Sequence, residues 1–191
     1  MSSSSPTATD QPSSTVAALL QARRDKVAKL QELGIDPWGS RFDDVHPIET
    51  VRKQGDSIAQ DADNGPTVRV AGRIMLLRNA GRLVFLDLVD RTGRIQVMIG
   101  KKQVGTDIWP VVGCLDLGDI IGVEGRLGYS NSGEMTIFAS SLTFPTKSLE
   151  TPPDKYHGLV DPELRQRMRY LDLIHGEGVR DRFVARSKII E

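Results

Sequence analysis

The sequence predicts a mainly β protein, a small barrel of five strands with a helix before it and a helical linker segment after it. Five short runs rich in Val, Ile and Leu follow one another, and their apolar residues alternate with polar ones. Gly72, Gly122 and Gly125 lie inside these runs, where a glycine is costly unless the strand bends or bulges. Asp107–Asp119, between the third and fourth runs, has the character of a short helix or loop. These features suit the five-stranded, partly open OB-fold barrel, and although a small sandwich would also fit five strands, the position of the helix favours the barrel.

The chain divides into four parts along its length. Residues 1–14 are rich in Ser, Thr and Pro without an aromatic residue, which is typical of a disordered lead-in. Residues 15–65 are predicted to form a helix and a polar linker with a second short helix. Residues 66–146 are predicted to form the barrel, and residues 147–191 a linker followed by the start of a further segment. The predicted strands are Thr67–Leu77, Leu83–Asp90, Arg94–Ile99, Asp119–Leu127 and Met135–Thr143.

The first helix is predicted over Thr15–Leu33, because Ser14 or Thr15 can cap its start and Gly34 and Pro37 end it. Six apolar side chains recur along it at roughly helical spacing and form one apolar stripe: Val16, Leu19, Leu20, Val27, Leu30 and Leu33. The opposite face carries four basic residues, Arg23, Arg24, Lys26 and Lys29. Basic helix faces are common, so we interpret this one as solvated, with contact to phosphates as the alternative.

Composition excludes several classes of protein. Hydrophobic residues make up 39% of the 191, enough for a packed core, and 25 basic against 25 acidic residues argue against a general polyanion binder. The single cysteine, Cys114, cannot form an intramolecular disulfide, and the three histidines are too scattered for a zinc site. The start has neither the charged and apolar regions of a secretory signal nor the arginines of a transit peptide. These features predict no membrane partner and a cytoplasmic location.

The second and third predicted strands leave two side chains on the polar face of the sheet, Phe85 and Gln96. An aromatic ring there needs a covering element or a ligand, and in an OB-fold this face binds oligonucleotides between the loops after strands one and four. Those loops would be Arg78–Arg82 and Tyr129–Glu134. The alternative is that the N-terminal helix covers Phe85. Residues 67–143 contain nine Lys or Arg against seven Asp or Glu, so we expect a reader of a few bases and not a sequence-blind binder.

Two segments of the predicted barrel, VAGRIMLLRNAGRLVFLDLVDRTGRIQVMI and DLGDIIGVEGRL, resemble the anticodon-binding domain of class II lysyl-tRNA synthetases. The segment TKSLETPPDKYHGLVDPELRQRMRYLDLI is more specific, because it is similar to the linker that separates lysyl enzymes from aspartyl and asparaginyl enzymes. RRDKVAKLQELGIDPW is similar to the N-terminal helix of this family, and RFVARSKIIE resembles the opening of motif 1 at the class II dimer interface. The resemblance covers residues 23–191.

The resemblance implies four nucleic-acid-binding residues. Phe85 falls on the stacking ring and Gln96 on a base-edge contact, while Arg78 and Glu134 flank them in the two loops. The sequence departs from the family near Leu77 and Ala80, where a second basic residue and a methionine are usual. The basic residues 165, 167 and 169 follow one another too closely to share one helix face, so we interpret their segment as a packing helix and not an RNA-binding patch.

The family implies a parent reaction, the ATP-dependent attachment of lysine to its tRNA, with ATP and magnesium in the full-length homodimer. The sequence given contains no residue of motifs 2 and 3 and no GxxxxGK or GxGxxG loop. We therefore expect a fragment that binds the anticodon of a tRNA for lysine, has no catalytic residue, metal or cofactor of its own, and is inactive and monomeric alone. Two other functions stay open, a free-standing RNA-binding module and an oligomerisation fragment.

Overall fold

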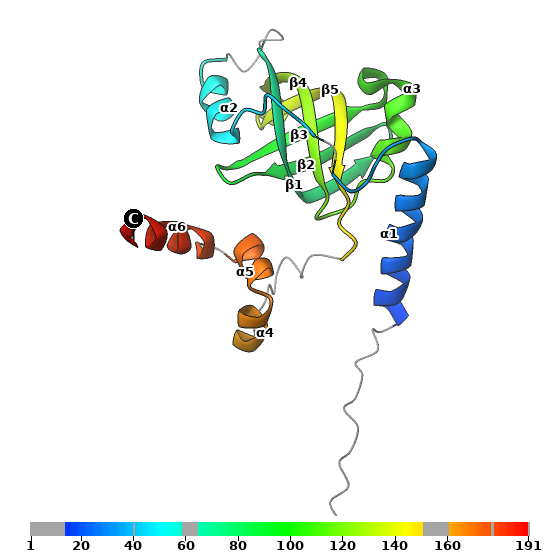
Figure 1. The fold of residues 1–191 in the computed structure, drawn as a ribbon. Coiled ribbons are helices and arrows are strands. Elements are labelled where there is room, and N and C mark those ends of the chain that lie inside the picture. The colour runs from blue at the N-terminus through cyan, green and yellow to red at the C-terminus, as the bar shows by residue number, and fades with distance from the viewer. Residues whose placement is uncertain (1–13, 40, 59–64, 151–160, 177, 191) are drawn as a thin grey trace, which may run out of the picture. The chain divides into compact units, whose positions relative to one another are not determined.

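A computed structural model describes residues 14–39, 41–58, 65–150, 161–176 and 178–190. The predicted lead-in, apart from its last residue, lies outside this described part. The chain forms two compact units, Met1–Glu150 and Thr151–Glu191 (Figure 1). The first unit ends at Glu150, four residues after Thr146, where the sequence predicts the end of the barrel. No helix in the described ranges is both long enough and apolar enough to cross a membrane.

The first unit contains a closed five-stranded barrel, which confirms the predicted fold (Figure 1). The strand order is β1-β2-β3-β5-β4, with β3 and β5 parallel and the other neighbours antiparallel. Each predicted strand lies within a few residues of an observed one. The strands are β1 Thr67–Ala80, β2 Leu83–Val89, β3 Arg94–Gly100, β4 Ile120–Tyr129 and β5 Met135–Thr146.

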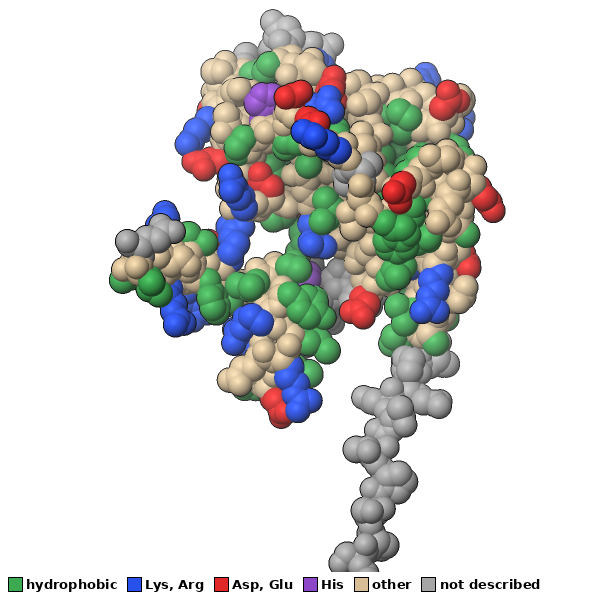
Figure 2. Space-filling view, in the orientation of Figure 1, with side chains coloured by type: hydrophobic (Ala, Val, Ile, Leu, Met, Phe, Trp, Pro, Cys, Tyr) green, Lys and Arg blue, Asp and Glu red, His purple; other side chains and the backbone are tan. Residues whose placement is uncertain are grey.

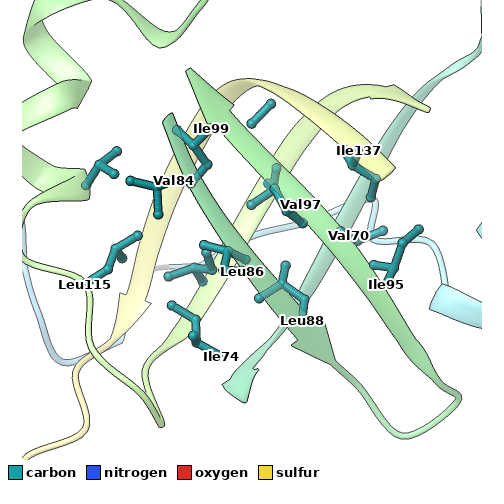
Figure 3. Close-up of a cluster of buried hydrophobic side chains, with 14 of the residues drawn as sticks. Val70, Ile74, Val84, Leu86, Leu88, Ile95, Val97, Ile99, Leu115 and Ile137 are labelled. Carbon is teal, nitrogen blue, oxygen red and sulfur yellow. The ribbon is translucent and has the colours of Figure 1, made fainter. Parts of the chain in front are cut away.

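The barrel core is built from the predicted alternation of β2 and β3. Val84, Leu86 and Leu88 of β2 are buried, and Figure 3 shows them together with side chains of β3 in one apolar cluster. Burial of one such side chain contributes about 1.5–3 kcal/mol. The same alternation directs the intervening residues of both strands outward, and this positions the candidate site.

Two of the strand glycines allow close approach of other groups. A Cβ at Gly125 would collide with the carbonyl oxygen of Phe138, at the point where the register of β4 and β5 shifts between Glu124 and Gly125. A Cβ at Gly122 would lie 2.6 Å from the ring of Phe42. The prediction that these glycines mark a bend or a bulge is confirmed, because the register of β4 and β5 also shifts between Ile120 and Gly122.

The predicted insert between the third and fourth strands is the helix α3, Lys101–Val112, which starts directly after β3 and therefore earlier than expected. Gly105, with φ of 82°, interrupts it. The second short helix, α2, covers Ile48–Gly55 and buries Ile48 and Val51. Both helices contact the barrel within the first unit.

The N-terminal helix α1, Ser14–Glu32, matches its predicted range, and its apolar stripe is buried only in part. Leu30 is buried, whereas Val16, Leu19 and Leu33 are exposed. Figure 1 shows why: the first turns of α1 extend past the barrel, so only the later turns meet it.

The predicted solvated basic face of α1 is wrong for two of its four residues, which bind the barrel unit, whereas Arg24 and Lys29 are exposed. Arg23 is buried and donates to the carbonyl oxygens of Leu117, Ser148 and Glu150 at 2.7–3.1 Å. Lys26 donates to Asp116 Oδ1 at 2.5 Å. The two cations thus dock the helix on residues 116–117 and 148–150, Arg23 through carbonyl oxygens and Lys26 through the carboxylate of Asp116.

A buried ionic cluster lies beneath this contact. Nζ of Lys147 is fully buried and lies 2.6 Å from Asp116 Oδ2 and 2.8 Å from Asp119 Oδ2. It also donates to the carbonyl oxygen of Cys114 at 2.8 Å. Burial raises the pKa of Asp119 in spite of the neighbouring Lys147. Burial alone would raise the pKa of Asp116 as well, but hydrogen bonds from Lys147 and Lys26 bring it below its ordinary value.

Asp90 connects the β2–β3 turn to α2. Its carboxylate accepts from the backbone N–H of Ile48 at the start of α2 and from the N–H groups of Thr92 and Gly93. Burial by itself would raise the pKa of Asp90, yet the hydrogen bonds from Ile48 and Thr92 lower it. The charged carboxylate is therefore the form that stabilises this corner of the fold.

We expect Asp90→Asn to lower the free energy of unfolding by about 1–3 kcal/mol at neutral pH, because the hydrogen bonds lose a charged acceptor. A depressed folded-state pKa gives stability that is present above the unfolded pKa and lost as the pH falls through the folded one. The difference between wild type and variant should therefore shrink under acid, as measured by urea unfolding along a pH series. A difference that stays constant down to strongly acidic pH would contradict this.

The second unit consists of α4 Pro162–Arg167, α5 Arg169–His175 and α6 Val179–Ile190. The helical interpretation of this segment is confirmed, but the spacing argument fails for two arginines. Arg165 and Arg169 are four residues apart and both bind the buried Asp172, at 2.8 and 2.7 Å. Both arginines therefore form ion pairs within this unit and help to hold its helices together.

Candidate nucleic-acid interface

Phe85 lies on the outward face of β2, half-buried, beside a guanidinium group. The Cζ atom of Arg78 is 5.1 Å from the centroid of the ring. The sequence places Arg78 in a loop, and this is corrected by the structure: β1 continues to Ala80, and Arg78 pairs directly with Phe85 across the β1–β2 ladder. The connection is shortened to the turn of Gly81 and Arg82, where Gly81 has φ of 66°.

Gln96 lies diagonally from Phe85 on the same sheet. In the β2–β3 ladder Phe85 pairs with Met98 and Asp87 pairs with Gln96, which agrees with the prediction that one ligand could reach both residues. Nε2 of Gln96 donates to Oγ1 of Thr136 at 3.2 Å, and this hydroxyl donates to the carbonyl oxygen of Glu134 at 2.8 Å. The side chain of Gln96 is therefore held from the β5 side.

Glu134 lies in the loop after β4, as predicted, and its side chain is exposed. The loop is a compact turn, in which the N–H of Ser130 donates to the carbonyl oxygen of Glu134 and the N–H of Glu134 donates to Oγ of Ser130. Glu134 also lines a surface hollow of about 630 Å³ between this loop, α2 and the β2–β3 turn. The hollow has three acidic and three basic side chains: Glu49, Asp56, Glu134, Arg52, Lys53 and Arg94.

The structure thus brings three of the four predicted residues together: Arg78 lies against Phe85, and Gln96 lies on the diagonal from Phe85. Through Thr136, Gln96 is joined only to the backbone carbonyl of Glu134, and Glu134 itself lines the hollow beside α2. The alternative prediction, that the N-terminal helix α1 covers Phe85, is not supported by the contacts of α1. The hydrogen bonds of its buried or half-buried residues go to residues 115–117 and 148–150.

The charges around this face are mixed. Arg94, two residues from Gln96, is paired with the nearly buried carboxylate of Asp87 at 2.8 Å. Figure 2 shows acidic and basic side chains interspersed on the visible face of the barrel unit. Such a surface offers little sequence-independent attraction for phosphates, so any affinity for nucleic acid has to come from stacking and from polar contacts to base edges.

Sequence reasoning did not identify Thr136. It is fully buried and pairs with Gln96 in the parallel β3–β5 ladder that closes the barrel. That register joins strands 40 residues apart in sequence. The signal available in the sequence was a polar residue between the apolar Met135 and Ile137, which alone does not identify its partner.

Known proteins resemble this chain over the barrel and beyond it. Residues 68–144 match a family described as the OB-fold nucleic acid binding domain. The chain is 44% identical over 170 residues to a lysine--tRNA ligase of Enterococcus faecalis, covering 88% of this chain and 34% of that protein. It is 44% identical over 174 residues to the enzyme of the same name from Listeria innocua and 41% identical over 174 residues to that from Bacillus subtilis, in each case over 90% of this chain and 35% of the relative. The chain therefore spans about a third of the length of the curated relatives it matches.

Proposed function

We propose that the outward face of β2 and β3 binds the anticodon loop of a tRNA for lysine. The barrel of this chain is an OB-fold nucleic acid binding domain, and the chain is homologous to the N-terminal region of lysine--tRNA ligases. The observation that carries this proposal is the half-buried ring of Phe85, flanked by the guanidinium of Arg78 and by Gln96 across the diagonal. A ring in this position offers a stacking surface to a base, and its polar neighbours reach the edge of that base.

Each of the four residues has a proposed role. Phe85 stacks on the central base of the anticodon. Arg78, which can only donate, contacts an acceptor of that base, and Glu134, which when ionised can only accept, bounds the site from the loop after β4. Gln96 supplies one donor and one acceptor to its edge. A lysine anticodon has uracil at its centre, and uracil offers O2 and O4 as acceptors and N3–H as a donor.

The reaction of the whole protein is part of the proposal. The relatives are named for joining lysine to tRNA, and we take the role of this region to be the selection of the tRNA in an ATP-dependent ligation in the cytoplasm. Binding of the anticodon at the barrel would then determine which tRNA is presented for ligation.

The proposal predicts that the chain binds an anticodon stem-loop with a central uracil more tightly than the same stem-loop with a central cytosine. Gln96→Ala and Arg78→Ala should each reduce this preference by about tenfold, because each removes a contact to the base edge. Fluorescence anisotropy with labelled stem-loops measures both affinities.

Gln31→Ala and Lys102→Ala are matched controls, since both side chains are exposed and lie on α1 and α3. They should leave the preference unchanged. Equal affinity of the wild type for the two stem-loops would end this assignment of the site.

The chain of 191 residues is proposed to be a monomer. Its barrel is closed and buries its core within one chain, so the strands that the structure describes leave no open sheet edge that a second copy would have to complete. Sedimentation at micromolar concentration should give the mass of one chain, and a dimer mass there would contradict the proposal.

A further inference from the structure

Thr136 is a buried residue whose hydroxyl contacts the side chain of Gln96. Its side chain is fully buried, and its strand pairs with that of Gln96 at this very position. The hydroxyl is 2.8 Å from the carbonyl oxygen of Glu134 and 3.2 Å from the side-chain amide of Gln96. The directions of these two hydrogen bonds depend on each other.

The carbonyl oxygen of Glu134 can only accept, so the single proton of the Thr136 hydroxyl is used there. Toward Gln96 the hydroxyl oxygen can then only accept, and the amide has to present its nitrogen. With the amide turned over, Oε1 of Gln96 would face an oxygen without a proton, and two acceptors would lie 3.2 Å apart. The hydrogen-bond network thus selects one of the two amide orientations.

The other end of the amide is left for a ligand. Among the residues that the structure describes, none donates a hydrogen bond to Oε1 of Gln96. A base beside Phe85 therefore meets an acceptor, Oε1, and the second N–H of Nε2, in a fixed order.

A fixed order of acceptor and donor separates uracil from cytosine. At ring positions 3 and 4 uracil presents a donor and then an acceptor, N3–H and O4, whereas cytosine presents an acceptor and then a donor, N3 and the amine. A glutamine amide matches either base in one of its two orientations, so a freely turning amide does not discriminate. An amide that cannot turn satisfies only one of them.

We propose that Thr136 is a positioning residue for base selection: it locks the amide of Gln96 so that Oε1 accepts from N3–H of the central uracil and cytosine is left with unpaired groups. This rests on the proposed anticodon-binding function, and it adds a residue and a mechanism to it. Thr136 itself touches no base.

The test is the uracil-to-cytosine affinity ratio of Thr136→Val, a substitution that keeps the shape and removes the hydroxyl. The ratio should fall about tenfold, in large part because the cytosine stem-loop binds more tightly once the amide can turn. A purely structural role for Thr136 would instead weaken both stem-loops. Thr136→Ser keeps the hydroxyl and should keep the ratio within about twofold of the wild type.

Two further comparisons test whether Thr136 changes the uracil-to-cytosine affinity ratio through Gln96. In a Gln96→Ala background, Thr136→Val should not change the ratio again, because residues that act through one another are not additive. The wild type should bind a stem-loop with central 3-methyluridine no better than the cytosine stem-loop, since the methyl group replaces the N3–H donor. This last measurement needs no variant and therefore holds even if Thr136→Val does not fold, which circular dichroism would reveal.

The outcomes separate the two proposals. A wild type that prefers uracil, with a Thr136→Val variant that has the same ratio, would overturn the role of Thr136 and leave anticodon binding intact. Tight binding of the 3-methyluridine stem-loop by the wild type would also overturn it. A wild type without any preference would overturn the reading of uracil at this site and the role of Thr136 together.

Discussion

Replacing Lys147 with methionine should lower the free energy of unfolding by about 3–5 kcal/mol, the largest effect we expect from a single substitution in this chain. Nζ of Lys147 is fully buried between the carboxylates of Asp116 and Asp119, and the Asp119 side chain is itself fully buried. Methionine fills the space of the aliphatic stem but leaves Asp119 without its cation. An uncompensated buried charge is strongly destabilising, even where the complete pair contributes little net stability.

The loss should depend on pH. In the wild type, hydrogen bonds from Lys147 and Lys26 lower the pKa of Asp116 against the effect of burial, so its contribution to stability disappears as the pH falls through that lowered value. Without Lys147 the buried carboxylates bind protons more readily, so the difference between variant and wild type should shrink under acid.

Urea unfolding followed by circular dichroism measures this loss. Lys102→Met, at an exposed lysine of α3, is the matched control and should change stability by less than about 0.5 kcal/mol. Adding Asp119→Asn to Lys147→Met should restore part of the loss, because the uncompensated charge is then gone. A Lys147→Met chain that is as stable as the control would contradict a structural role for the buried cluster.

Phe85→Ala should weaken binding of the anticodon stem-loop by about 1–3 kcal/mol, or on the order of 5- to 150-fold. Stacking on an aromatic ring does not depend on the identity of the base, so the uracil and cytosine stem-loops should lose affinity alike. This separates Phe85 from Gln96 and Arg78, whose substitution should chiefly change the ratio of the two affinities.

The half-buried position of Phe85 allows its ring to be removed without opening the core. Tyr170→Ala, at an aromatic residue of α5 that is 54% exposed, is the matched control and should leave both affinities unchanged. If Phe85→Ala bound both stem-loops as the wild type does, the ring would not be the stacking surface.

The alternation of apolar residues predicted the strands, and the position of the helical insert between the third and fourth strands favoured a barrel over a sandwich. Val84, Leu86 and Leu88 are buried as their spacing indicates, and the same period directs Phe85 and Gln96 to the outer face. Side chains that are two residues apart in a strand share a face wherever the strand lies. For that reason the candidate site could be located before its neighbours were known.

The parts that the sequence did not predict depend on contacts between distant segments. The stripe of α1 has helical spacing, but a helix buries only what another surface covers, and its first turns lie past the barrel. Lys147 follows the last strand like an ordinary linker lysine, and only the folded chain brings Asp116 and Asp119 around it. Thr136 meets Gln96 through the closure of the barrel, a register that no local pattern contains.

The position of Arg78 illustrates how a local signal can mislead. The stretch from Arg78 to Arg82 contains Asn and Gly, residues typical of a loop. The chain needs only two of these residues for the turn, and the remaining ones extend β1 so that Arg78 pairs with Phe85. The side chain therefore belongs to the rigid sheet, where its distance from the ring is set by the ladder.

The central claim is that the outward face of β2 and β3 is where this chain binds RNA. The most direct test is a titration of the ¹⁵N-labelled chain with the unlabelled anticodon stem-loop of a tRNA for lysine, followed by amide chemical shifts. We expect the largest changes around Phe85 and Gln96 and in the loop Ser130–Glu134, with small changes on α1 and on α4 to α6. Largest changes on those helices, or an unchanged spectrum at saturating RNA, would contradict the claim.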